Sequence, residues 1–197
     1  MLTIGITGGI GCGKTTASTF FSDKGAFIFN ADKEAKKYLK KTISIQHKLI
    51  NAFGNSVTSQ SKLSLKKLAD VAFSSKMDQQ ILNGILWPEI HMLIQKSKED
   101  AIENNFDLFI VDAALIIEGK FYNSLDQTIL IIADESKRIN RAIKRKNLPL
   151  EQIQKRMMLQ LSDAEKKKFS DKIIENNGSV EELYSKLNKY YNNIINK

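Results

Sequence analysis

The residues with the clearest chemical purpose form a glycine-rich run near the N-terminus. Residues 8–15 read Gly-Gly-Ile-Gly-Cys-Gly-Lys-Thr and match the pattern G-x-x-x-x-G-K-[ST]. Glycines let the backbone curl with positive φ and bring N–H groups within reach of phosphate oxygens. Lys14 would reach the terminal phosphates, and the Thr15 hydroxyl would ligate Mg²⁺. The run therefore predicts a phosphate-binding loop for a nucleotide.

The elements on either side of this loop are those that the motif needs. Residues 2–7 are apolar and predict a buried strand, whereas Ala17, Phe20 and Phe21 follow the loop at helical spacing. A helix that begins near Lys14 would add unpaired N–H groups and its positive dipole end. From ordinary residue frequencies, a chance match in a chain this long has a probability of roughly one per cent or less. We therefore expect a protein that binds a nucleotide.

The single cysteine, Cys12, lies inside this loop. A thiol among backbone N–H groups at a helix N-terminus has its thiolate favoured, which would make Cys12 reactive. The alternative is a small buried residue that is inert to reagents, and the sequence leaves both open. One cysteine cannot form an internal disulfide, which points to a reducing compartment, and we expect the cytoplasm.

Two acids follow predicted strands and are candidates for the same site. Asp32 comes just after the short apolar run 26–30, and Asp112 ends the run 108–112. Ligands in open parallel sheets lie beyond the carboxyl ends of the strands, so both acids are expected near the loop. Asp112 would hold Mg²⁺ through water. The alternatives are a helix N-cap for Asp32 and a polar strand end for Asp112.

The four arginines all lie in one short segment. Arg138, Arg141 and Arg145 are spaced to share one helix face in residues 136–146, and Arg156 lies in a helix that Pro149 opens and that runs to about residue 161. Because the guanidinium fork suits phosphate, this clustering indicates a local phosphate site. The two helices, joined at residues 147–149, look like a mobile lid. The alternative is a solvated amphipathic hairpin.

The rest of the chain predicts an α/β fold in three layers, α/β/α, with a five-stranded parallel sheet and the phosphate loop after the first strand. Further strands are expected at 128–133 and 172–175, and a last helix follows a capping box at Ser179. Residues 33–105 are helical without a strand, with helices at 44–53, 65–73 and 77–86 and one that Pro88 opens. We expect a single domain: a core of 1–32, 106–137 and 170–197, a helical acceptor-binding insertion at 33–105, and a lid at 138–169.

Composition narrows the class of partner. The chain has 197 residues and a net charge of +8, but 26 of its 30 basic residues are lysines scattered along it. Without a clustered basic and aromatic surface, a nucleic-acid-binding ATPase is disfavoured. No apolar run approaches the roughly 20 residues that span a bilayer, and no secretory leader is expected. A GTP-driven switch is also disfavoured, because such proteins read guanine with the motif N-K-x-D. The nearest match here, Asn188-Lys189, lacks the Asp. We expect a monomer with a small-molecule substrate and neither nucleic acid nor membrane as a partner.

Several motifs in register resemble the dephospho-coenzyme A kinases, a family of P-loop kinases similar to nucleoside-monophosphate kinases. Residues 7–15 and 30–32 resemble the family's T-G-G-I-G-S-G-K-S/T and D-A-D. The likeness extends over essentially the whole chain, through residues 53–54, 68–73, 88–90, 115–118, Arg141, Arg145, Gln160 and 171–178.

The resemblance implies transfer of the ATP γ-phosphate to the ribose 3′-hydroxyl of dephospho-coenzyme A, with Mg²⁺ bound. It implies that Lys14, Asp32 and Arg141 are catalytic, with Asp32 orienting or deprotonating the acceptor hydroxyl. The nucleotide would be held by Gly8, Gly9, Ile10, Gly11, Cys12, Gly13, Lys14, Thr15, Thr16, Arg141, Arg145 and Asn177. Thr15 and Asp112 would hold the metal. The alternative is a P-loop kinase for another small acceptor, such as a nucleoside monophosphate.

The chain departs from the family pattern at several positions. Asn30 replaces the first acid of D-A-D, Trp87 stands where histidine usually precedes proline, and Leu65 occupies a place often held by arginine. Ala114 replaces the proline of P-L-L, while Asp163 and Lys166 lie where arginines are frequent. Of the departures at Asn30, Trp87, Leu65 and Ala114, three concern the half of the site that would bind the acceptor.

Overall fold

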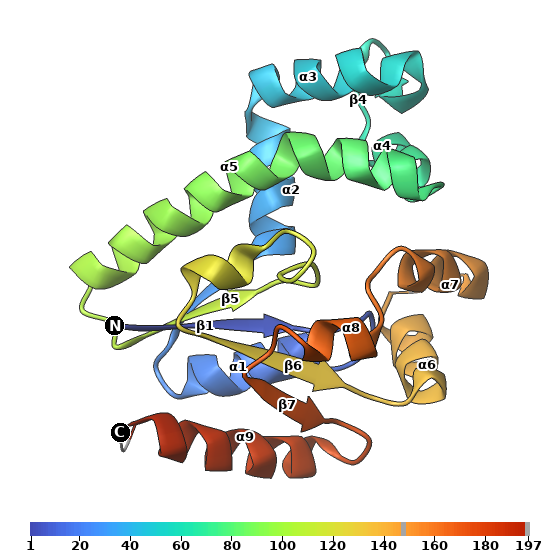
Figure 1. The fold of residues 1–197 in the computed structure, drawn as a ribbon. Coiled ribbons are helices and arrows are strands. Elements are labelled where there is room, and N and C mark those ends of the chain that lie inside the picture. The colour runs from blue at the N-terminus through green and yellow to red at the C-terminus, as the bar shows by residue number, and fades with distance from the viewer. Residues whose placement is uncertain (147–148, 196–197) are drawn as a thin grey trace. The chain divides into compact units, whose positions relative to one another are not determined.

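The computed structural model describes residues 1–146 and 149–195, which are organised as two compact units (Figure 1). One unit contains residues 1–30 and 97–197, and the other contains residues 31–96. The long helix α5 (Lys76–Glu103) runs from one unit into the other.

The larger unit is built on a five-stranded parallel sheet in the order β2-β5-β1-β6-β7 (Figure 1). All five strands lie where the apolar runs predict them, and their ends differ by at most one residue from the prediction. The strands are β1 Leu2–Thr7, β2 Phe27–Asn30, β5 Leu108–Asp112, β6 Gln127–Ile132 and β7 Lys172–Glu175. In this register Asn30 and Ile6 are both partners of Asp112, so three carboxyl strand ends meet at one edge of the sheet.

One face of the sheet is covered by α1 (Lys14–Asp23) and α9 (Val180–Ile195) (Figure 1). Phe20 and Phe21 of α1 make ring contacts with Tyr184, Tyr190 and Tyr191 of α9 at centroid distances of 5.4 to 6.5 Å. Such pairs contribute about 0.5–1.5 kcal/mol each beyond their area burial. This aromatic layer fixes α1, and with it the C-terminal end of the phosphate loop.

The opposite face is covered in part by residues 113–125, which include the 3₁₀ turn η2 (Phe121–Ser124). A Cβ atom at Gly5 would lie 2.8 Å from Leu125 and 2.9 Å from Ile116, so this segment packs directly on β1. Residues 114–120 of this segment form turns.

Three further helices follow β6 and precede β7. They are α6 Glu135–Lys146, α7 Leu150–Met158 and α8 Asp163–Lys167. The sequence predicts α6 and α7 but not α8, whose capping box of Ser162 and Glu165 is a signal that could have found it. The predicted joint at residues 147–149 includes residues 147–148, which lie outside the described residues.

The smaller unit is mainly helical and has its own core. Its elements are α2 Ala31–Lys41, α3 Ile43–Phe53, η1 Gly54–Val57, β3 Thr58–Ser59, β4 Lys62–Leu63, α4 Leu65–Ala72 and the first part of α5. The helices predicted at 44–53 and 65–73 are confirmed within one residue as α3 and α4. Gly54, which follows α3, has a φ of 68°, and the Oγ of Ser64 before α4 accepts from the Lys67 amide.

Two predictions for this unit are wrong. Residues 33–105 contain a short antiparallel hairpin, β3–β4, whose turn residues Gln60 and Ser61 have φ of 49° and 60°. Hairpin turns of this kind usually show Asn-Gly or Asp-Gly, so the sequence carries no signal for it.

The second wrong prediction is a break in the helix at Trp87-Pro88, because α5 is one continuous helix with Pro88 inside it. A proline removes one hydrogen bond, here to the carbonyl of Gly84, and costs about 3 kcal/mol. Leu82, Leu86 and Ile94 are buried on both sides of the proline, so burial of the apolar stripe outweighs that cost. No helix among the described residues is both long and apolar enough to cross a membrane.

Candidate active site

The glycine-rich loop joins β1 to α1, as the motif requires. Gly8, Gly11 and Gly13 have φ of 142°, 77° and 107°, which places them in the left-handed region that disfavours side chains. Gly13 is the N-cap residue of α1, and a Cβ atom there would lie 2.2 Å from the Asn176 amide nitrogen. The loop thus turns tightly onto the N-terminus of a helix, where anions bind.

Lys14 lies over the loop that it follows in sequence. Its ammonium group donates to the carbonyl oxygens of Gly8, at 2.7 Å, and Gly9, at 3.2 Å. The cation is therefore held at the loop, where phosphate oxygens can exchange for these carbonyls. Thr16, a further predicted ligand, lies partly exposed in the first turn of α1.

The three arginines of α6 contact the phosphate loop, the start of α1 and the segment after β7, and they share one helix face as their spacing predicts. Arg145 donates to the Thr15 hydroxyl at 2.9 Å, and Arg141 donates to the carbonyl oxygens of Asn176, at 2.9 Å, and Gly178, at 3.4 Å. Arg138 donates from Nε to the carbonyl of Ile10 at 3.1 Å. Positively charged guanidinium groups, whose planar fork suits phosphate, therefore border the loop.

Asn177 connects α6 to the end of β7. Its side-chain oxygen accepts from the amide of Asp134 at 2.8 Å, and its side-chain nitrogen donates to the Asp134 carboxylate at 2.9 Å. Lys137 donates to the Asn177 carbonyl at 2.5 Å. Asn177 thus fixes the start of the arginine-bearing helix.

Thr15 and Asp112 are the residues expected to hold Mg²⁺. Asp112 is 4% exposed, and its carboxylate accepts from the Asn30 side-chain amide at 3.0 Å. Hydroxyl and carboxylate oxygens are the hard ligands that Mg²⁺ prefers, and it usually takes only one or two carboxylates together with substrate phosphates. The described residues form no cluster of three or more His, Cys, Asp or Glu side chains that could hold a metal ion.

Asp32 is exposed in the first turn of α2 and belongs to the smaller unit, whereas the phosphate loop belongs to the larger one. The helix already includes Ala31, so Asp32 lies inside it and the alternative that it is the N-cap residue is wrong. A carboxylate in a first turn interacts favourably with the helix dipole.

Cys12 is only 1% exposed, and its backbone carbonyl accepts from Asn176 at 2.8 Å. Thiol reactivity requires access as well as a thiolate. Of the two readings that the sequence leaves open, the structure favours the small buried residue.

A buried ion pair beside the loop has no counterpart among the predicted site residues. Lys166 of α8 is fully buried and contacts a Glu118 oxygen at 3.0 Å and the Ala114 carbonyl at 2.8 Å. Burial lowers the pKa of Lys166, while the Glu118 carboxylate opposes that shift. Glu118 also accepts from the Leu161 amide at 3.0 Å. Glu118, in the loop after β5, therefore binds both α8, through Lys166, and the segment before α8, through Leu161. The resemblance singles out position 166, where arginines are frequent, but nothing in the sequence shows that this lysine is buried.

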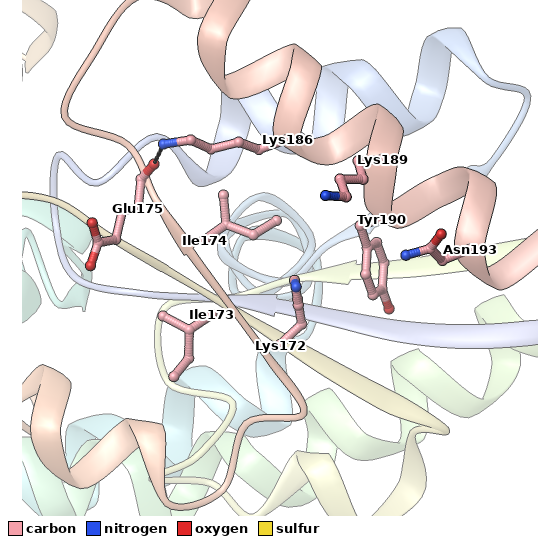
Figure 2. A pocket seen from close by; sticks show the side chains of 8 residues that line it. All are labelled: Lys172, Ile173, Ile174, Glu175, Lys186, Lys189, Tyr190 and Asn193. Carbon is pink, nitrogen blue, oxygen red and sulfur yellow. Dashed lines mark hydrogen bonds between the residues drawn. The ribbon is translucent and has the colours of Figure 1, made fainter.

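A groove of about 340 Å³ lies elsewhere on the larger unit, between β7 and α9 (Figure 2). It is lined by Lys172, Lys186, Lys189, Tyr190 and Asn193 among others, and none of the predicted site residues lines it. Lys186 donates to the Glu175 carbonyl at 2.7 Å, as Figure 2 shows. Of these lysines, Lys172 lies on the edge strand β7, where a lysine discourages pairing with other chains, whereas Lys186 and Lys189 belong to α9.

Comparisons with known proteins agree with the geometry of the loop. A family profile described as dephospho-CoA kinase matches residues 2–182. A dephospho-CoA kinase from Fusobacterium nucleatum is 32% identical over 191 residues, which cover 96% of this chain and 97% of that protein. One from Salinibacter ruber is 33% identical over 192 residues, covering 97% of this chain and 96% of that protein.

A solved structure agrees as well. The dephospho-CoA kinase from Campylobacter jejuni superposes with a TM-score of 0.67 at 26% identity, covering 98% of this chain and 96% of that one. A match that includes the phosphate loop, both units and the arginine-bearing helix is a match to the whole protein rather than to a common motif. The chain belongs to the dephospho-CoA kinase family.

Proposed function

We propose that this protein transfers the γ-phosphoryl group of ATP to the ribose 3′-hydroxyl of dephospho-coenzyme A, giving coenzyme A and ADP. The observation that carries the proposal is the family match over residues 2–182. The kinase chemistry is supported by Lys14, which lies over the phosphate loop, and by Arg145, which donates to Thr15 at the end of the loop. Arg141 donates to the carbonyl oxygen of Asn176, whose side chain donates to Cys12 of the loop.

The phosphate loop and its cations would bind and orient the nucleotide. Backbone N–H groups of residues 8–16 would surround the phosphates, and Lys14 would exchange its contacts with Gly8 and Gly9 for phosphate oxygens. Arg141 and Arg145 would neutralise charge that develops on the transferred group. In a loose in-line phosphoryl transfer, positioning and charge neutralisation supply almost all of the catalysis.

Thr15 and Asp112 would hold Mg²⁺, which neutralises phosphate charge when it is bound. The Thr15 hydroxyl also accepts from Arg145, so this arginine lies beside a residue that would hold the metal. The Asn30 amide, which donates to the buried Asp112 carboxylate, would keep that carboxylate oriented.

Asp32 would accept the proton of the acceptor hydroxyl, and the helical unit of residues 31–96 would bind the rest of the acceptor. The segment from α6 to α8 would act as a lid that closes over the nucleotide and excludes water. A basic lid and loop also suit an acceptor that carries several phosphates.

The experiment is a measurement of ADP formation by the purified protein with Mg-ATP across a panel of acceptors. Dephospho-coenzyme A should be phosphorylated much faster than AMP, CMP or shikimate, and the product should carry its phosphate on the 3′-oxygen. Lys14→Met provides the inactive control, since it removes the loop cation. Equal rates with a nucleoside monophosphate would mean a kinase for another acceptor.

A further inference from the structure

Arg138 shares the arginine-bearing face of α6 with Arg141 and Arg145, but the family resemblance gives it no role. Its side chain is 12% exposed and lies across the tip of the phosphate loop. Nε donates to the Ile10 carbonyl at 3.1 Å, and Nη1 lies 3.4 Å from the Asp163 carboxylate of α8. The guanidinium is therefore held at two points, one on the loop and one on α8.

The glycines of the loop fit closely around this arginine. A Cβ atom at Gly9 would lie 1.8 Å from Arg138 Nη2 and 2.4 Å from its Cζ, and one at Gly11 would lie 2.1 Å from the Arg138 backbone oxygen. Gly9 is not among the glycines with positive φ, so its own backbone conformation accepts a side chain. What excludes a side chain at position 9 is Arg138.

The same loop peptide is held from a second side. The amide of Ile10 donates to Gln160 Oε1 at 3.2 Å, while the carbonyl of Ile10 accepts from Arg138. Gln160 lies next to Leu161, whose amide is bound by Glu118. Both polar groups of the residue at the loop tip are thus satisfied by side chains that other elements fix in place.

We infer that Arg138 is a positioning residue that keeps residues 9–11 in the conformation that receives phosphate, and that glycine is required at position 9 to admit it. The inference rests on the proposed function only in taking the loop to bind ATP. A loop whose N–H groups are already arranged loses less entropy on binding than one that must be ordered. Loss of Arg138 should therefore weaken nucleotide binding more than it slows phosphoryl transfer.

The test is a double-mutant cycle with Gly9→Ala and Arg138→Ala. A methyl group at position 9 would push the guanidinium off Ile10 and Asp163, so each single change removes the same contact. A hydrogen bond from a charged group corresponds to about a tenfold change or more in an equilibrium constant. Each single variant should raise the Kd of a fluorescent ADP analogue about tenfold. The double variant should bind the analogue no more weakly than either single variant does.

Kinetics separate positioning from catalysis and from general stability. In Arg138→Ala, KM for ATP should rise about as much as Kd, while kcat with dephospho-coenzyme A changes less than about threefold and the thermal midpoint stays close to that of the wild type. Lys144→Met is the matched control, because it removes a positive charge from an exposed position of the same helix. It should bind nucleotide as the wild type does.

Two results would overturn the inference: wild-type affinity in Arg138→Ala, or multiplicative losses of about a hundredfold in the double variant. If Arg138→Ala does not fold, Arg138→Lys keeps the charge without the fork and serves in its place. The Kd cycle needs no acceptor, so it remains informative if the wild type fails to phosphorylate dephospho-coenzyme A and the proposed function falls.

Discussion

At the scale of single residues, the departure at Asn30 has a structural meaning. An amide at this position donates to the Asp112 carboxylate at 3.0 Å. A second carboxylate there would place two like charges together, which raises the pKa of one of them. The amide adds no second charge beside Asp112 and cannot itself act as a base, so Asp32 is the residue that we propose as the base.

Asp32→Asn tests that assignment at the same scale. The substitution keeps size and polarity but removes basicity, and loss of a general base costs on the order of 10²–10⁴-fold in rate. Asp32 is exposed and is not the helix cap, so the thermal midpoint and the affinity for ATP should hardly change while kcat falls steeply. Steady-state kinetics and thermal melting measure the two effects.

Asp70→Asn is a suitable control for that prediction, because Asp70 is an exposed carboxylate of α4 in the same unit. Normal turnover by Asp32→Asn, with or without a lower thermal midpoint, would exclude Asp32 as the base.

At the scale of elements, the start of β1 is tied to the residue before β6 by one carboxylate. Asp126 accepts from the Thr3 hydroxyl at 2.7 Å and from the Thr3 amide at 2.8 Å. The hydrogen bond from the Thr3 side chain is the main cause that lowers the pKa of Asp126, and the bond from the Thr3 amide adds to it. Together they outweigh desolvation, so the pKa of Asp126 lies below its ordinary value. The contact joins two neighbouring strands of the sheet at the end opposite to the phosphate loop.

A pH dependence follows for Asp126. Because its folded-state pKa is lowered, the stabilisation is present above the unfolded value of about 3.9 and is lost as the pH falls through the folded value. Asp126→Asn should lower the free energy of unfolding by about 1 kcal/mol at pH 7, a modest amount because the site is partly solvated.

Urea unfolding at several pH values should show the difference between wild type and Asp126→Asn shrinking below about pH 4. Asp100→Asn, an exposed change on α5, should show no such trend. A constant difference down to pH 2 would mean that the effect of Asp126 is one of packing rather than charge.

At the scale of the whole molecule, the net charge of +8 has to be reconciled with a small-molecule enzyme. The three arginines of α6 contact the phosphate loop, Thr15 and the segment 176–178, whereas the lysines that line the β7–α9 groove (Figure 2) are exposed. A dispersed basic field attracts any polyanion without reading its sequence.

RNA binding should therefore be weak and should depend steeply on salt. We expect a labelled single-stranded RNA to bind with a Kd no tighter than about 10⁻⁶ M near physiological salt, and binding should weaken strongly between 50 and 200 mM salt. Fluorescence anisotropy across this range measures it, and scrambled RNA sequences should bind equally. Sequence-selective binding that persists at 200 mM salt would reveal a nucleic-acid function.

Local patterns were sufficient to predict the framework of this protein. The five strands, the phosphate loop, α1 and the shared face of Arg138, Arg141 and Arg145 each follow from apolar periodicity, glycine placement or helical spacing. These signals are carried by residues close together in the chain, so they can be read without knowing what packs against them.

Contacts between distant segments decided the rest. Helix α5 continues through Pro88 because its apolar side chains are buried on both sides, and the β3–β4 turn forms at Gln60 and Ser61 without glycine. Lys166 is buried against Glu118, which lies 48 positions away in the chain. Arg138 lies over Gly9, which is 129 positions away. Desolvation and steric fit depend on neighbours that only the folded chain supplies, and for that reason the sequence alone could not reveal them.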